Sequence, residues 1–268
     1  QQHILPALIA AAAVLALLRT SHTWVQNYVQ ERRAEQLQRF REHMTRVWKR
    51  SASGRFRACR REMLRYDLAA LPPEQLFLWH KTMATMSEHA YKRAETEREP
   101  TWRLAVKGYA SAYDYATTQA ERNDILMRLI PLYLAREKVV RKRETDNDSD
   151  NGYLLAEKAI AQIDRNLLSA EDCRRVDLYH ARCLWHLDMS GEALALIQRL
   201  QLESDDRDWR TRAMILEAEW KLKLAGNWRL LDAEKTPVSR RKRTKQLVRE
   251  ARELREEARA MANRKSVV

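Results

Sequence analysis

Glycine, proline and cysteine are all scarce in this sequence of 268 residues, which contains five Gly, six Pro and three Cys. So few helix-breaking residues exclude a chain built on glycine-rich turns and allow regular helix to run almost uninterrupted. The three cysteines, Cys59, Cys173 and Cys183, are odd in number and unpatterned, which argues against a disulfide framework and suits a reducing compartment. We therefore expect an all-α protein with buried thiols.

Catalytic motifs are missing as well. The sequence has no phosphate-binding glycine loop, no HExxH helix and no GxSxG elbow. The only metal-like grouping is Cys173, His180, Cys183 and His186, with Asp177 beside them. One helix over this span extends about 20 Å, so these side chains cannot all reach one ion. We expect no enzymatic activity, no metal, no cofactor and no small-molecule substrate.

Basic residues are in excess: Lys and Arg number 50 against 37 Asp and Glu, which gives a net charge of +13. This charge implies an acidic partner, for which anionic lipid of the cardiolipin type, an acidic protein and, less favoured, nucleic acid all qualify. The residues expected to contact anionic lipid are Arg32, Arg33, Arg39, Arg41, Arg46, Arg55, Arg57, Arg60 and Arg61. Those expected to contact an acidic protein or RNA are Arg240, Arg241, Lys242, Arg243 and Lys245.

One long apolar run stands near the start, from Ile4 to Leu18, with fifteen residues and no charge. About 20 apolar residues cross a bilayer unaided, but Arg19 can snorkel and the aromatic turn from Trp24 to Val29 can lie at the interface. We predict a transmembrane anchor here, with a buried core helix as the alternative. The anchoring residues are Ile4, Leu5, Leu8, Ile9, Val14, Leu15, Leu17 and Leu18.

The charge beside this run predicts an orientation. Between Arg19 and Arg65 there are thirteen Arg or Lys against four Glu, so the bulk of the chain should stay on the positive-inside face. This predicts a mitochondrial inner membrane with the bulk in the matrix, or alternatively a bacterial inner membrane with the bulk in the cytoplasm.

Apolar residues at spacings of three and four predict helices throughout the chain, with a break at 51–54 and a new helix at Pro73. The predicted organisation is a membrane anchor and interfacial turn at 1–30, a basic helix with the first hairpins at 31–143, an acidic loop at 144–152, helical hairpins at 153–236, and a C-terminal basic helix at 237–268. In the last helix, Leu247, Ala251, Leu254, Ala258 and Met261 form a heptad seam. It fits a short coiled coil and a closing helix equally well.

The segment 176–202 has apolar residues on two predicted helices that are joined by a turn at 189–192. These residues are Leu178, Ala181 and Trp185 before the turn and Ala193, Ile197 and Leu200 after it. The pattern resembles a tetratricopeptide (TPR) repeat, a family in which large, small and aromatic residues line the first helix, and small and large residues line the second. Looser matches occur at Ala105, Tyr109 and Ala112, at Ala156, Ile160 and Ile163, and at Trp209, Ala213 and Leu216. Arg182 stands where the family has a glycine. The resemblance implies stacked helical hairpins with a concave protein-binding face.

These features together predict a noncatalytic, membrane-anchored accessory subunit of a large complex, such as a mitochondrial respiratory complex or ATP synthase. Its TPR-like hairpins would bind neighbouring protein subunits. Two alternatives to this prediction remain open. One is an RNA-contacting helical-repeat protein of an organellar ribosome, and the other is a TPR scaffold of a bacterial inner membrane.

Overall fold

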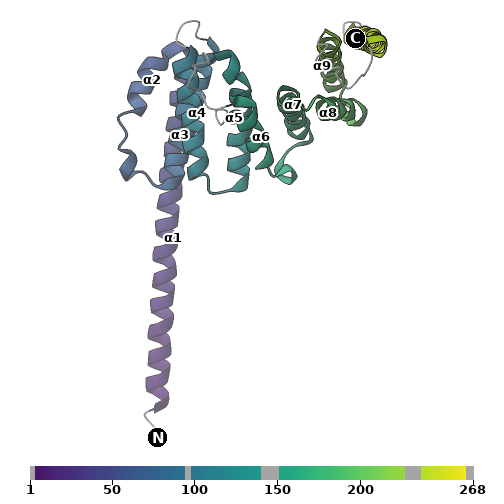
Figure 1. The fold of residues 1–268 in the computed structure, drawn as a ribbon. Coiled ribbons are helices and arrows are strands. Elements are labelled where there is room, and N and C mark those ends of the chain that lie inside the picture. The colour runs from purple at the N-terminus through teal and green to yellow at the C-terminus, as the bar shows by residue number, and fades with distance from the viewer. Residues whose placement is uncertain (1–3, 94–97, 140–150, 227–236, 264–268) are drawn as a thin grey trace. The chain divides into compact units, whose positions relative to one another are not determined.

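The computed structural model describes residues 4–93, 98–139, 151–226 and 237–263 (Figure 1). These residues form helices and turns and contain no strand, so the all-α expectation is confirmed. The chain divides into two compact units, residues 1–116 and residues 117–268.

Unit 1 contains α1 (Ile4–Arg50), α2 (Phe56–Met63), α3 (Pro73–Arg93) and α4 (Arg98–Tyr115). A π-helical turn, Ser51–Arg55, joins α1 to α2, and Gly54 within it has φ +100°, a conformation that suits glycine. The turn brings α2 back beside the end of α1, where Arg50 donates to both carboxylate oxygens of Glu62 at 2.8 and 2.7 Å. The predicted break at 51–54 and the predicted start at Pro73 are both confirmed.

The core of unit 1 forms where the end of α1 packs with α2 and α3. Its buried side chains are Met44, Val47, Cys59, Met63, Trp79 and Met86. The preceding stretch of α1 extends past the other helices of this unit (Figure 1), and its residues 21–36 are exposed. Helix α4 lies very close to α3, because a Cβ added at Gly108 would be 2.9 Å from the Cβ of Ala84.

Unit 2 contains α5 (Gln119–Val139), α6 (Gly152–Ala161), α7 (Ala170–His186), α8 (Ser190–Glu203), α9 (Arg207–Gly226) and α10 (Pro237–Asn263). Each of these helices packs against the next one along the chain. Helix α7 begins at a capped position, since the Ser169 hydroxyl accepts from the Asp172 N–H at 3.1 Å.

Helix α5 is joined to the turn that follows α6 by a reciprocal pair of hydrogen bonds. The Asn123 amide donates to the Asp164 carbonyl at 2.7 Å and accepts from the Asp164 N–H at 3.1 Å. At the other end, Gly152 allows the first turn of α6 to approach α5, because a Cβ there would meet the carbonyl oxygen of Tyr133. These contacts tie α5 to the first turn of α6 and to the turn after it.

The predicted transmembrane helix is wrong. Residues 4–18 belong to the 47-residue helix α1. Across the part of the chain that the structure describes, none of the helices combines the length and the apolarity needed to cross a bilayer. The physical reason is the run itself, which has fifteen uncharged residues before Arg19, against the roughly 20 that a span needs. The inner-membrane localisation, mitochondrial or bacterial, depended on this anchor and is wrong with it.

The side chains of the anchoring residues predicted between Ile4 and Leu18 lie outside the described part of the structure. The acidic loop predicted at 144–152 also falls mostly outside it, since description resumes at Asn151 and α6 begins at Gly152. The observed division into units lies at Ala116 and Thr117, before that loop.

Candidate binding surfaces of the helical hairpins

Helices α7 and α8 form the hairpin that the sequence places at 176–202. The chain reverses at Asp188, whose φ is +63°, and the Met189 N–H donates to the Leu184 carbonyl at 2.9 Å. The turn therefore lies before the predicted position at 189–192, because α8 already begins at Ser190. The six residues predicted to pack in this hairpin all belong to one apolar cluster: Leu178, Ala181, Trp185, Ala193, Ile197 and Leu200. Ala181 and Ala193 have no exposed surface, so the two helices meet at small side chains.

Helix α9 continues the same cluster through an aromatic stack. The rings of Trp185 on α7 and Trp220 on α9 lie 4.7 Å apart at 6° to each other. Trp220 is only 3% exposed. The helical periodicity predicts Trp185 in the hairpin but gives no sign of its pairing with Trp220, because 35 residues separate the two in the sequence. A stack of this kind holds the first helices of successive hairpins together.

A buried polar network, which sequence reasoning missed, connects α8, α9 and α10. The Glu217 side chain is 4% exposed and accepts from the Gln198 and Gln201 amides at 2.8 and 2.6 Å. Lys221 lies 2.9 Å from the Glu217 carboxylate and 2.7 Å from that of Glu250 on α10. Three helices are therefore joined by one set of mutually satisfied groups.

The network perturbs the acid–base properties of its members. Burial alone would lower the pKa of Lys221, but its hydrogen bonds to Glu250 and Glu217 raise that pKa above its usual 10.5. The hydrogen bond from Lys221 lowers the pKa of Glu250 below its usual 4.5. Glu250 thus stabilises the fold above its unfolded pKa and loses this contribution as the pH falls through the lowered value. Lys221 contributes below its unfolded pKa and loses its contribution only as the pH rises through the raised value.

Helix α10 closes unit 2 by packing on α9 with the side of the predicted heptad seam. Leu247, Ala251 and Ala258 are buried in this contact. In the structure, α10 is therefore a closing helix of unit 2 and not part of a coiled coil. The opposite side is basic. The exposed basic residues described on α10 are Arg241, Lys242, Arg243, Lys245, Arg249, Arg252, Arg255 and Arg259. Four of the five residues predicted to contact an acidic partner are among them, and the side chain of Arg240 lies outside the description.

The nine arginines predicted to contact anionic lipid do not form one surface. Arg32, Arg39, Arg41 and Arg46 are exposed along α1, and Arg55, Arg57 and Arg61 are exposed at the π-helical turn and on α2. Arg32 is held on its own helix, with its guanidinium donating to the Tyr28 hydroxyl at 3.0 Å. Arg33 is also exposed, Arg60 is half-buried, and each lines a hollow of unit 1, as do Arg41 and Arg46.

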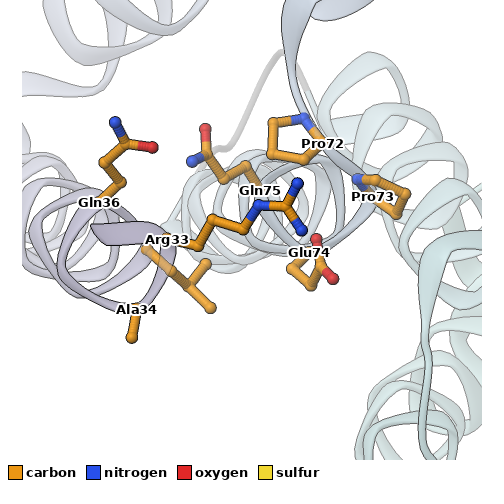
Figure 2. A pocket seen from close by; sticks show the side chains of 8 residues that line it. Arg33, Ala34, Gln36, Pro72, Pro73, Glu74 and Gln75 are labelled. Carbon is orange, nitrogen blue, oxygen red and sulfur yellow. The ribbon is translucent and has the colours of Figure 1, made fainter. Parts of the chain in front are cut away.

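The hollow at Arg33 lies between α1 and the start of α3 and has a volume of about 470 Å³. Its walls are Arg33, Ala34, Gln36 and Leu37 on one side and Pro72, Pro73, Glu74 and Gln75 on the other. Figure 2 shows the Arg33 side chain extending from α1 toward the first turn of α3, where Glu74 lies. Because a positive and a negative side chain both line this hollow, it favours neither an anionic nor a cationic ligand.

The cysteine and histidine residues considered for metal binding are spread along α7. Cys183 is fully buried, and burial raises the pKa of its thiol to about 12. Cys173 donates to the Arg165 carbonyl at 3.7 Å, and the His186 ring stacks on Tyr153 of α6 at 4.0 Å. Among the described residues there is no group of three or more His, Cys, Asp or Glu placed to hold a metal ion.

The α7–α8 crossing yields a direct prediction. Replacing Ala193 by leucine should overpack the crossing and destabilise unit 2 by about 1 to 3 kcal/mol, because no free space adjoins this buried position. Ala195→Leu is the matched control, since Ala195 lies on the same helix but is exposed. Hydrogen exchange of α7 and α8 should show faster opening only for Ala193→Leu. Equal effects of the two substitutions would contradict the close crossing.

In comparisons with known proteins, no protein-family model matches the chain, and neither a curated protein nor a solved structure matches it.

Proposed function

We propose that this chain is a noncatalytic helical scaffold whose TPR-like hairpins bind a protein neighbour in a larger complex. The observation that supports the proposal best is the serial packing of α5 to α10, in which each helix contacts the next one in the chain. Stacked hairpins of this kind offer extended surfaces to other proteins. The buried ionisable groups of unit 2 also suit a structural role, because Glu217 and Lys221 satisfy each other within the stack.

The basic side of α10 is the part of this scaffold that we expect to meet an acidic protein surface. The positive potential is strongest over the first half of α10, where Arg241, Lys242, Arg243 and Lys245 are exposed and no acidic residue is, whereas Glu253, Glu256 and Glu257 are exposed among the arginines of the second half. An acidic protein would be attracted by this potential over a Debye length, which is about 8 Å at physiological salt. An RNA-contacting role is the second candidate, since the same side chains could neutralise phosphates.

The test is to purify the tagged chain from its native cells and to identify stoichiometric companions by mass spectrometry, with and without nuclease treatment. A scaffold for protein should keep the same companions after nuclease. If nuclease releases them all, the RNA-contacting alternative replaces the proposal.

The charge on α10 gives a sharper prediction for the same companions. Replacing Arg241, Lys242, Arg243 and Lys245 with glutamine should weaken binding at low salt, and the difference should shrink toward 1 M salt, where the Debye length is about 3 Å. Thermal stability should hardly change, because exposed charges contribute little to it.

A matched control neutralises Arg249, Arg252, Arg255 and Arg259 instead, which removes the same charge from the other end of α10. If both quadruple variants weaken binding equally, the partner senses only net charge. If the first variant unfolds unit 2 and leaves binding intact, the role assigned to these residues is wrong.

A further inference from the structure

A cavity of about 240 Å³ lies inside unit 1, where α2, α3 and α4 meet. Helix α2 and the turn after it contribute Arg60, Leu64 and Leu68. Helix α3 contributes Trp79 and Met83, and helix α4 contributes Leu104 and Lys107. Leu64 is 59% exposed and Lys107 is exposed, so these two side chains stand at the mouth.

The cavity follows from the close approach of α3 and α4. Gly108 lines it, and a Cβ at this position would be only 2.9 Å from the Cβ of Ala84. One turn later, α4 places the short side chain of Ser111 in the same wall. Two small residues, at i and i+3 on one face, leave space that larger side chains would fill.

The polar groups deep in the wall are already paired. The Trp79 ring N–H donates to the Met63 carbonyl at 3.0 Å, and the Ser87 hydroxyl donates to the Met83 carbonyl at 2.8 Å. His80 stacks on Tyr115 at 5.4 Å, and burial lowers the pKa of its ring. Away from Arg60, the wall therefore offers mainly apolar surface to a ligand.

The edge of the cavity is positively charged. Arg60 and Lys107 are its two charged lining residues, and no acidic residue lines it. The Nε of Arg60 is buried and has no hydrogen-bond partner among the described residues. An orphaned guanidinium nitrogen beside apolar space is a ready donor for a carboxylate.

We propose that this cavity binds a small amphiphilic carboxylate, with its tail among Trp79, Met83 and Leu104 and its carboxylate at Arg60 and Lys107. The volume of about 240 Å³ limits the length of the tail. A group the size of a water molecule takes about 30 Å³, so the cavity holds roughly eight groups of that size. A medium-chain monocarboxylate such as octanoate fits this space.

The test titrates the full chain with octanoate and with octanol, its uncharged counterpart, in a calorimeter. The variant Arg60→Gln with Lys107→Gln should bind octanoate about tenfold or more weakly, because it lacks the charge-assisted hydrogen bonds, while octanol binding should change less than about twofold. Arg61→Gln is the matched control, because Arg61 lies on α2, is exposed and does not line the cavity.

A second variant tests the cavity itself. Ser111→Phe places a ring in the space and should abolish binding of both ligands while the helical circular dichroism is retained. The proposal is overturned if the wild type shows no saturable octanoate binding up to about 10 mM, because a dissociation constant above that concentration is too weak for a specific site. It is also overturned if the double variant weakens octanoate and octanol equally, or if Arg61→Gln weakens octanoate as much.

Discussion

Replacing Trp220 by alanine is expected to lower the free energy of unfolding of unit 2 by about 3 to 5 kcal/mol. Trp220 is 3% exposed and lies in the cluster that joins α7, α8 and α9, so its removal leaves a cavity at the centre of the stack. Trp185→Ala should cost about 3 kcal/mol, since Trp185 is only partly buried.

The double variant identifies the contribution of the stack. The rings are 4.7 Å apart and nearly parallel. The double variant should therefore lose less stability than the sum of the two single losses, and the difference should be about 0.5 to 1.5 kcal/mol. Native-state hydrogen exchange of α7, α8 and α9 measures the opening free energy in each variant. Leu202→Ala, at a position that is 85% exposed, is the control and should change nothing. Strictly additive losses would contradict the stack.

Replacing Glu217 by alanine should destabilise the α8–α9–α10 region by about 3 to 5 kcal/mol, which is typical when one partner of a buried ion pair is removed. The substitution leaves the Gln198 and Gln201 amides without their acceptor and leaves Lys221, whose side chain is 12% exposed, with Glu250 alone. Hydrogen exchange of α8, α9 and α10 measures the loss.

Two comparisons make this second result specific. Glu219→Ala removes an exposed carboxylate from the same helix and should have little effect. Replacing Glu217 and Lys221 together by methionine should recover much of the stability, because a buried ion pair exchanged for apolar side chains is often neutral. If Glu217→Ala costs no more than Glu219→Ala, the network does not hold the three helices together.

The failed membrane anchor shows where a local pattern misleads. The run from Ile4 to Leu18 was interpreted as a span because the aromatic residues after Arg19 could extend it. In the structure Trp24 is 68% exposed and stacks on Tyr28 of the same helix at 5.7 Å, within a helix that continues to Arg50. The helix propensity of its residues favours a helix of 47 residues, but helix propensity does not indicate whether lipid, water or protein surrounds that helix.

The helical character of this protein, the break near Gly54, the helix start at Pro73 and the pairing of α7 with α8 could all be predicted from the sequence. Each of these features depends on interactions between near neighbours along the chain. Capping, backbone conformation and a 3.6-residue period all act over a few residues, so they can be recognised in one sequence.

Only the tertiary structure decided which distant residues meet. Lys221 pairs with Glu250 across 29 positions, and Tyr109 donates to the buried Glu88 carboxylate at 2.7 Å across 21. The cavity beside Arg60 likewise depends on how closely α3 and α4 approach at Gly108. Charged and small residues at such positions carry no periodic signal, because their partners are set by the crossing of helices and not by the spacing along any one of them.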